Sequence, residues 1–447
     1  MRKDAGLIKW AMIMLFCLLA SFVICTAALA DSNGECGANL TWTLTDDGLL
    51  TISGTGAMTS YSWNASEVKQ VYIEDGVTSI ESCVFEGYSS LTSITIPEGV
   101  TSIRSGAFAG CSSLTSITIP NGVTSIEYST FNGCSSLTNI IIPDSVTSIE
   151  DYAFNDCSSL ASITIPSSVT SIGSSTFYGC SSLVSVTIPD SVTSIGSSAF
   201  SRCSSLVSIT IPDSVTSIGG AAFSFCSSLT SITIPEGVTS IERAFYGCSS
   251  LTSITIPNSI TSIGDTAFCE CSSLTSITIP DSVTSIGSSA FSGCSSLTSI
   301  TIPDSVTSIG YRAFYGCSSL TSIAIPESVT SIGDSAFEGC SSLTSIYCYT
   351  SSYAESWAIE NVLGDKMILI SHSLTSIAAQ AATCTEAGNS AYWKCSECNK
   401  YFSDASGETE IAENSWVIAA TGHSWNTPTY TWSEDYSSVT ATRTCKN

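Results

Sequence analysis

Basic residues are scarce in this chain of 447 residues, which has 13 Lys and Arg against 38 Asp and Glu and a formal net charge of −25. Such a chain repels phosphate groups, so we expect no nucleic acid and no anionic membrane surface among its partners. Histidine is rarer still, with two residues, and neither lies between residues 68 and 342. The many serines of that segment therefore lack an imidazole base, and no G-x-S-x-G, phosphate-loop or H-E-x-x-H motif is present. We expect a protein that is not an enzyme.

Long hydrophobic runs are also missing, with one exception at the N-terminus. There, three basic residues precede an apolar run at residues 10–25, and small residues at 28–30 suit a cleavage site. This order is typical of a secretory signal peptide, which we place at residues 1–30. No later run reaches the length of a membrane helix. We therefore expect a secreted or cell-surface protein with no membrane span after signal cleavage.

A unit of about 23 residues recurs between Val68 and Ser342, and one step, from Leu229 to Leu251, has 22 residues. A period of this length is typical of a solenoid, in which each coil buries its apolar face against its neighbours. Eleven of the 12 prolines occupy one position of the unit, directly after a segment of strand-like alternation. Proline has no backbone donor and ends such a strand. We predict a mainly β fold in which residues 68–342 form twelve coils around a parallel sheet.

The second half of the unit contains an Ala-Phe pair surrounded by Ser and Gly, which propagate a helix poorly. We predict a tight turn or a single helical turn there. The short unit lacks one residue between Ile241 and Phe245. We expect this deletion to tighten the outer turn at Glu242 and Arg243 while strand stacking continues unbroken.

Written with x at variable positions, the unit reads LxxIxIPxxVTSIGxxAFxxCxx. This pattern is similar to the BspA-type leucine-rich repeat of bacterial surface proteins, and the chain resembles those of gut-type Gram-positive bacteria from Val68 to about Ile346. The resemblance implies a leucine-rich-repeat solenoid that adheres to host matrix proteins, host cells or other bacteria. The residues alone predict only an extended surface that is suited to binding.

The segments outside the repeat suggest caps and a separate module. Alternating apolar residues on both sides of Asp46-Asp47-Gly48 predict a β-hairpin cap at residues 31–67. We place a second cap at residues 343–370, with a short helix that starts at Ser352 and has Glu355 three residues on. Residues 371–422 form a small module rich in Cys, His and aromatic residues, and residues 423–447 read as the start of a second one, truncated at Asn447.

Eleven of the 21 cysteines occupy one position of the repeat. Equivalent residues of stacked coils lie roughly 5 Å apart, a separation at which a disulfide could form. All these side chains would nevertheless point the same way, into the core. We favour a ladder of buried free thiols, with some oxidised pairs as the alternative.

The C-terminal module contains a C-x-x-C sequence followed by a small residue and Lys, which resembles a zinc knuckle. A closed set of four ligands would be His372, Cys384, Cys395 and Cys398. A structural zinc ion, a disulfide and free thiols remain open as readings of these residues. We expect no cofactor in the repeat itself.

Comparison of the copies separates two surfaces. The exposed sheet positions, such as Ser93 and Thr95, hardly change from copy to copy, whereas the segment around the Ala-Phe pair varies. Tyrosine and arginine, which often anchor interfaces, recur in that variable segment. The candidate ligand-binding residues are Tyr128, Tyr152, Tyr178, Arg202, Tyr246, Tyr311, Arg312 and Tyr315.

Two functions fit this pattern. The first is a secreted or surface-attached protein that binds an extracellular protein or glycan, either through the variable turns or through many equivalent contacts to the hydroxyl rows of the sheet. The second is a stiff structural spacer that displays the terminal module and has no specific ligand. Near-identity of the copies suits a spacer, and variation in tyrosine and arginine suits a binding protein.

Overall fold

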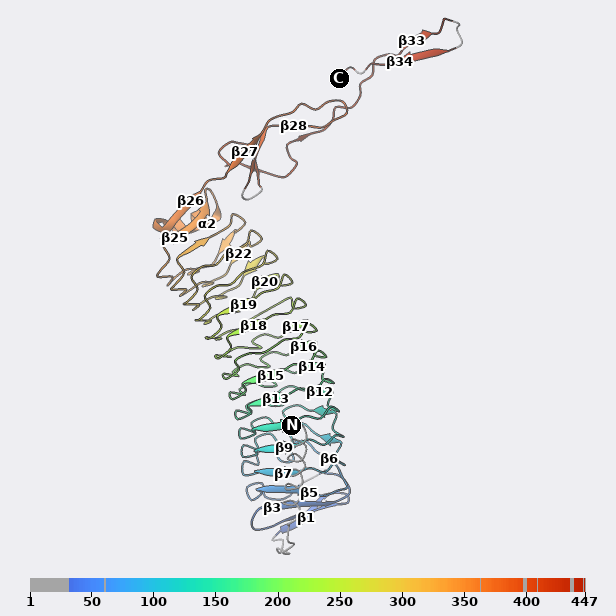
Figure 1. Cartoon of the computed structure of the whole chain (residues 1–447), viewed down its shortest axis with the longest axis vertical. Coiled ribbons are helices and arrows are strands. Elements are labelled where there is room, and N and C mark those ends of the chain that lie inside the picture. The colour runs from blue at the N-terminus through green and yellow to red at the C-terminus, as the bar shows by residue number, and fades with distance from the viewer. Residues whose placement is uncertain are drawn as a thin grey trace, which may run out of the picture. The chain divides into compact units, whose positions relative to one another are not determined.

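The computed structural model describes residues 32–59, 62–361, 363–396, 400–407, 409–434 and 438–444, together with Lys446. The signal peptide expected at residues 1–30 lies outside the described residues. The chain divides into two compact units, Met1–Val215 and Thr216–Asn447, and the same kind of coil recurs in both (Figure 1).

One coil of the second unit shows why the repeat folds as it does. Its eight inward side chains are at most 5% exposed: Leu320, Ile323, Ile325, Val329, Ile332, Ala336, Phe337 and Cys340. Pro326 ends the first strand, and its carbonyl accepts a hydrogen bond from the amide of Val329 at 3.1 Å, which closes the turn. Burial of a large aliphatic or aromatic side chain is worth roughly 1.5–3 kcal/mol, so repetition of this pattern supplies a continuous core.

In the first unit, the N-terminal strands are antiparallel and the coils then add parallel strands to the same sheet. Its order is β1 (Ser32–Gly37), β2 (Leu40–Leu44), β3 (Leu49–Gly54), β5 (Gln70–Ile73), β7 (Ser93–Thr95), β9 (Ser116–Thr118) and β11 (Asn139–Ile141). The next coils contribute β13 (Ser162–Thr164) and β15 (Ser185–Thr187), which pair in parallel and in register. The hairpin of β2 and β3 therefore leads directly into the coils.

A second row of shorter strands accompanies the first, and from Pro97 onward its strands follow the proline turn. In the first unit it comprises β4 (Gly56–Ala57), β6 (Val77–Ile80), β8 (Ser102–Ile103), β10 (Ser125–Ile126), β12 (Ser148–Ile149), β14 (Ser171–Ile172) and β16 (Ser194–Ile195). Equivalent residues face each other, as Ser125 faces Ser148. The repeat period is therefore also the register of the sheet.

The second unit has the same two rows. The first row comprises β18 (Ser231–Thr233), β19 (Ser253–Thr255), β23 (Ser322–Ala324), β25 (Ser345–Tyr349) and β26 (Met367–Ile370). The second row comprises β17 (Ser217–Ile218), β20 (Ser262–Ile263), β21 (Ser285–Ile286), β22 (Ser308–Ile309) and β24 (Ser331–Ile332).

The short coil affects only one of these rows. β18 and β19 pair in parallel with Ser231 opposite Ser253, so the first row continues across the deletion as expected. The second row is interrupted, because residues 240–241 of the short coil, all of which are described, form no strand. The expectation of unbroken strand stacking therefore holds for the main sheet and is wrong for the second row, where the missing residue leaves too little chain to keep the strand register.

The predicted fold class is confirmed, but the number of coils is about 14 rather than twelve. Parallel pairing extends beyond the repeat motif at both ends. β3 pairs in parallel with β5, and β25 pairs in parallel with β26, so segments that lack the full motif still add turns to the solenoid.

After β25, a helix covers the last coil. α2 (Tyr353–Glu360) begins at Ser352, whose hydroxyl accepts a hydrogen bond from the amide of Glu355 at 3.2 Å. The short 3-10 helix η1 (Gly364–Lys366) then leads into β26. The C-terminal region contains β27 (Leu374–Ile377), β28 (Gly388–Asn389), β29 (Tyr392–Cys395), β30 (Tyr401–Phe402), β31 (Glu410–Ile411), β32 (Val417–Ile418), β33 (Thr429–Trp432) and β34 (Val439–Thr442).

Stacked phenylalanine rings run along the core of each unit. In the second unit, the ring centroids of Phe268 and Phe291 are 5.5 Å apart, and those of Phe314 and Phe337 are 5.3 Å apart. The repeat cysteines lie beside this stack, and ten of their thiols donate to the carbonyl of a core phenylalanine in the preceding coil, as Cys294 does to Phe268 at 3.2 Å. The eleven repeat cysteines are buried free thiols, in agreement with the favoured reading.

Candidate binding surface on the turn edge

We define the turn edge as the residues from four before to two after each core phenylalanine. In every coil from Phe85 to Phe337, the residues two before and two after the phenylalanine have positive φ angles. This left-handed conformation favours glycine, because a side chain there costs roughly 1–2 kcal/mol. Each coil therefore makes a tight turn at this edge and no helix.

The position two residues after the phenylalanine shows which coils depart from the rule. Eight coils have glycine there, and four have a side chain: Asp156, Arg202, Phe225 and Glu270. Retention of a side chain at a strained backbone position is a feature that recurs at functional sites. The four exceptions therefore direct attention to the same edge as the variation among the copies.

In the first unit, the candidate residues form two contact pairs. The rings of Tyr128 and Tyr152 meet edge to face with centroids 5.5 Å apart. The guanidinium carbon of Arg202 lies 5.7 Å from the ring centroid of Tyr178. Residues 24 positions apart in sequence thus become neighbours because adjacent coils stack on one another.

In the second unit, Tyr246 packs against Phe225 with centroids 4.8 Å apart. Arg312 lies over two rings, with its guanidinium carbon 5.1 Å from the centroid of Tyr311 and 4.8 Å from that of Tyr315. Both Tyr311 and Arg312 are exposed. The eight candidate residues are therefore all in aromatic or cation–π contacts, which hold large side chains in place before a ligand arrives.

Phe225 is the residue that the choice of candidates missed. It is 41% exposed and has a φ angle of 59°. Its signal in the sequence was the loss of glycine two residues after Phe223, which becomes meaningful only when the left-handed conformation of that position is known.

Several acidic residues of the turn edge accept hydrogen bonds from the neighbouring coil. Glu127 accepts hydrogen bonds from the amide and hydroxyl of Ser105, at 2.9 and 3.0 Å, and lies 3.4 Å from the guanidinium of Arg104. Asp265 accepts from the amide of Ser288 at 2.7 Å. These carboxylates satisfy backbone donors of the neighbouring coil, which limits the freedom of the turns.

Tyr128 stands beside a shallow hollow in the first unit. Its amide donates to the Glu150 carboxylate at 3.0 Å, which fixes the backbone from which the ring projects. The hollow has a volume of about 330 Å³ and is lined by Tyr128, Ser148, Ile149, Glu150, Asp151, Ser171 and Gly173. The turn edge therefore has a surface depression as well as chemically varied side chains.

The sheet face differs from this edge. Its Ser and Thr side chains are largely exposed, and where threonine follows the leading leucine its hydroxyl can bond the neighbouring coil, as Thr138 does to the carbonyl of Thr115 at 3.2 Å. Three aliphatic residues interrupt the hydroxyl rows in the first unit: Ile141 at 66%, Val184 at 50% and Val207 at 45% exposure. None of these three residues was among the candidates chosen from the sequence.

The predicted zinc ligands are not assembled among the described residues. No three His, Cys, Asp or Glu side chains of the described ranges lie together as a metal site, so His372, Cys384 and Cys395 do not converge. His372 packs instead against Tyr349 and Phe402, at 4.8 and 4.5 Å between centroids. Cys398 lies outside the described residues, and the four-ligand set stays a prediction.

His372 and Lys400 meet one acidic residue of the last full coil. The Nε2 atom of His372 is 3.9 Å from the carboxylate of Glu327, and Nζ of Lys400 is 3.1 Å from it and 2.8 Å from that of Glu410. Burial alone would lower the pKa of Lys400, but its hydrogen bonds to Glu410 and Glu327 outweigh that effect and raise the pKa. Lys400 thereby links the C-terminal region to the last full coil electrostatically.

A parallel solenoid with coils of about 23 residues, a strand face and a tight turn edge defines a leucine-rich repeat protein. The model of the BspA type leucine rich repeat region matches residues 57–182, 148–275 and 261–399. The chain belongs to this BspA-type family, as the repeat pattern predicted.

Solved structures agree with this assignment. The chain is 35% identical to a leucine rich cell surface protein from Faecalibacterium prausnitzii, with a TM-score of 0.50, over 74% of this chain and 98% of that one. It is 31% identical to a leucine-rich repeat protein from Bacteroides ovatus, with a TM-score of 0.52 and the same coverage. None of the curated proteins that were searched matches the chain. Within the described ranges, no helix has the length and apolar character needed to cross a membrane.

Proposed function

We propose that this chain is a secreted cell-surface protein that binds an extracellular protein through its turn edge. The observation that supports this most is the set of aromatic and cation–π contacts among eight exposed or half-buried side chains, at an edge where the backbone favours glycine. Tyrosine and arginine contribute disproportionately to the free energy of protein–protein binding, because they bury large areas with little loss of conformational entropy. Adhesion to host matrix, host cells or other bacteria is the biological role that fits this surface and family.

A stiff spacer without a specific ligand is the second candidate. It is favoured by the regularity of the coils, whose equivalent strand residues face each other in register through most of each unit. A spacer needs no particular side chain at the turn edge, so the two functions differ in what replacement of those residues does.

The experiment starts with the purified chain on an array of extracellular matrix proteins and glycans. A second chain carries serine at the eight candidate positions, and its far-UV circular dichroism is compared with that of the parent to show that the fold is kept. For each anchor that contacts the ligand, we expect a loss of about 1 kcal/mol or more in binding free energy. Absence of any bound protein, or equal binding by both chains to every bound component, would contradict the proposal.

A further inference from the structure

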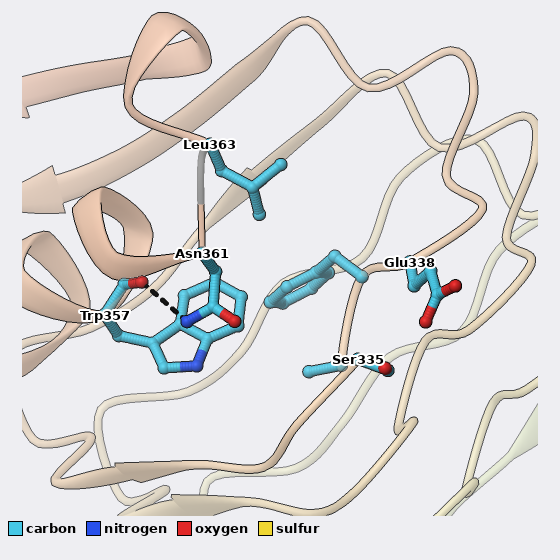
Figure 2. Close-up of a pocket in the computed structure, with 7 residues that line it drawn as sticks. Ser335, Glu338, Trp357, Asn361 and Leu363 are labelled. Carbon is cyan, nitrogen blue, oxygen red and sulfur yellow. Dashed lines mark hydrogen bonds between the residues drawn. The ribbon is translucent and has the colours of Figure 1, made fainter.

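The stack of phenylalanine rings in the second unit ends in a change of geometry. Phe314 and Phe337 are parallel within 2°, whereas the next ring, Trp357 of α2, meets Phe337 edge-on at 72° with centroids 5.7 Å apart. A helix has replaced a coil here, so the turn edge of the last coil is covered less completely. A hollow of about 260 Å³ results, lined by Ser335, Phe337, Glu338, Trp357, Asn361 and Leu363 (Figure 2).

The lining combines an apolar floor with oxygen atoms. Phe337 and Trp357 are 3% and 6% exposed and form the floor together with Leu363. The Asn361 amide nitrogen donates to the carbonyl of Trp357 at 2.9 Å, which leaves the side-chain oxygen of Asn361 to accept other bonds (Figure 2). Glu338 and Ser335 stand on the other side of the hollow (Figure 2).

Glu338 is the one charged side chain among these lining residues, and it is exposed. No ion pair involves it among the described parts of the chain. Asp334 of the same coil is also exposed. Arg312, in the adjacent coil, is held over Tyr311 and Tyr315, and no ion pair joins it to either carboxylate within the described ranges. The hollow therefore has a free negative charge at its rim, in a chain whose net charge is −25.

The size of the hollow limits what can enter. Small-molecule and cofactor sites usually have volumes of about 300–1,000 Å³, so 260 Å³ is too small for most such ligands but large enough for one long side chain. Lysine and arginine side chains combine an apolar stem with a cationic tip, which matches an apolar floor under a carboxylate. A cation can also rest on the faces of aromatic rings.

We propose that this hollow receives a lysine or arginine side chain of a partner protein. The methylene groups would lie on Phe337, Trp357 and Leu363, and the cationic tip would meet the oxygens of Glu338 and Asn361. Tyr311, Arg312 and Tyr315 do not line this hollow, and its lining can be tested without knowledge of the partner.

The test uses the whole purified chain labelled with 15N at tryptophan, in which the indole signal of Trp357 is assigned through Trp357→Phe. The probes are the Nα-acetyl methylamides of lysine, arginine and norleucine, the last of which has lysine's apolar stem without the charge. Lysine and arginine probes should shift the Trp357 signal saturably, and the norleucine probe should bind about five-fold or more weakly than the lysine probe. No saturable shift, or equal affinity for lysine and norleucine, would overturn the proposal.

Two substitutions that each remove one negative charge distinguish binding in the hollow from attraction by the overall negative charge of the chain. Glu338→Gln should weaken binding of the lysine probe about five-fold, whereas Glu236→Gln, which removes an exposed carboxylate of the same unit outside the hollow, should leave it almost unchanged. Equal losses of lysine-probe affinity in both variants would mean that long-range attraction alone binds the probe, and would overturn the proposed site. Replacement of Tyr311, Arg312 and Tyr315 by serine should leave probe affinity almost unchanged, so failure of this site and failure of the proposed turn-edge function give different results.

Discussion

The sheet face and the turn edge belong to the same coils, yet their residues vary to different degrees from coil to coil. On the sheet face, one strand segment recurs with Ser and Thr at its exposed positions, and its exceptions are few. On the turn edge, tyrosine, arginine, phenylalanine and acidic residues replace one another from coil to coil. The comparison shows that variation is permitted at the edge where fewer side chains take part in the hydrogen bonds between coils.

The physical reason lies in the hydrogen bonds. Many hydroxyls near the sheet donate to the carbonyl of the previous coil, as Thr307 does to Thr284 at 3.2 Å and Ser305 to Val283 at 2.6 Å. Loss of such a hydroxyl removes a bond that links two coils, at a net cost of roughly 0.5–1.5 kcal/mol. At the turn edge, most bonds between coils join backbone groups, with carboxylates such as Glu127 as exceptions, so most side chains there are free to differ.

The largest expected effect comes from ionisation of the core that supports both surfaces. Burial raises the pKa of Cys111 and of Cys248 from 9.0 to about 12. Because the folded pKa is raised, the stabilising contribution of each thiol is complete below pH 9 and is lost as the pH rises toward 12. Each such thiol should remove about 1.4 kcal/mol from the free energy of unfolding per pH unit in that interval.

Urea denaturation under reducing, oxygen-free conditions at pH 8, 10 and 11 measures this loss. The sheet face and the turn edge should unfold together, because the same row of buried thiols packs in the core behind both. A urea midpoint that is constant from pH 8 to 11 would contradict burial of these cysteines as thiols.

The next prediction compares the stability lost when a buried residue and a half-exposed residue of the turn edge are replaced. Phe314→Ala removes a buried ring from the stack and should cost about 3–5 kcal/mol. Tyr315→Ala, one residue further on, changes a half-exposed side chain and should cost about 1 kcal/mol or less. Thermal and urea midpoints of the two variants provide the measurement, and similar losses for both would mean that the candidate binding residues are part of the core.

Substitution by glycine should change the free energy of unfolding by a smaller amount, and in opposite directions on the turn edge and the sheet face. Glu270→Gly relieves a residue with a φ angle of 60° and should stabilise the chain by about 0.5 kcal/mol after the entropy cost of glycine is counted. Thr278→Gly, on the sheet face, should destabilise it by about 1 kcal/mol, because glycine weakens an extended strand position. Urea midpoints that shift in the same direction for both variants would break the comparison.

The period of the sequence was sufficient to predict the coil, its inward residues and the family, because each coil repeats the same packing problem. It was not sufficient to count the coils. Residues 49–54 and 367–370 lack the repeat motif, but they still pair in parallel with neighbouring strands. Strand pairing depends on backbone groups that every residue has, so it can continue where the side-chain pattern stops.

The sequence predicted that the candidate residues lie along one edge of the coils, but it did not predict which of their side chains are in contact. Register explains why Tyr128 meets Tyr152, since they come from adjacent coils. The position of Arg312 between two tyrosines of its own coil depends on a left-handed turn that the sequence does not display. In the C-terminal module, the long segments between His372, Cys384 and Cys395 leave their spatial arrangement open, and no periodicity constrains it.

The most direct test compares binding by two matched variants once a protein partner has been found on the array. In one variant, Tyr311, Arg312 and Tyr315 are replaced by serine. In the other, Thr255, Thr278 and Thr301 on the sheet face of the same unit are replaced by valine, which keeps the shape of threonine and removes its hydroxyl. If the partner binds the turn edge of the second unit, the first variant should lose about 1 kcal/mol or more in binding free energy, and the second should bind like the parent. A partner that loses affinity with the sheet variant and is indifferent to the turn variant would contradict the claim that the turn edge carries recognition.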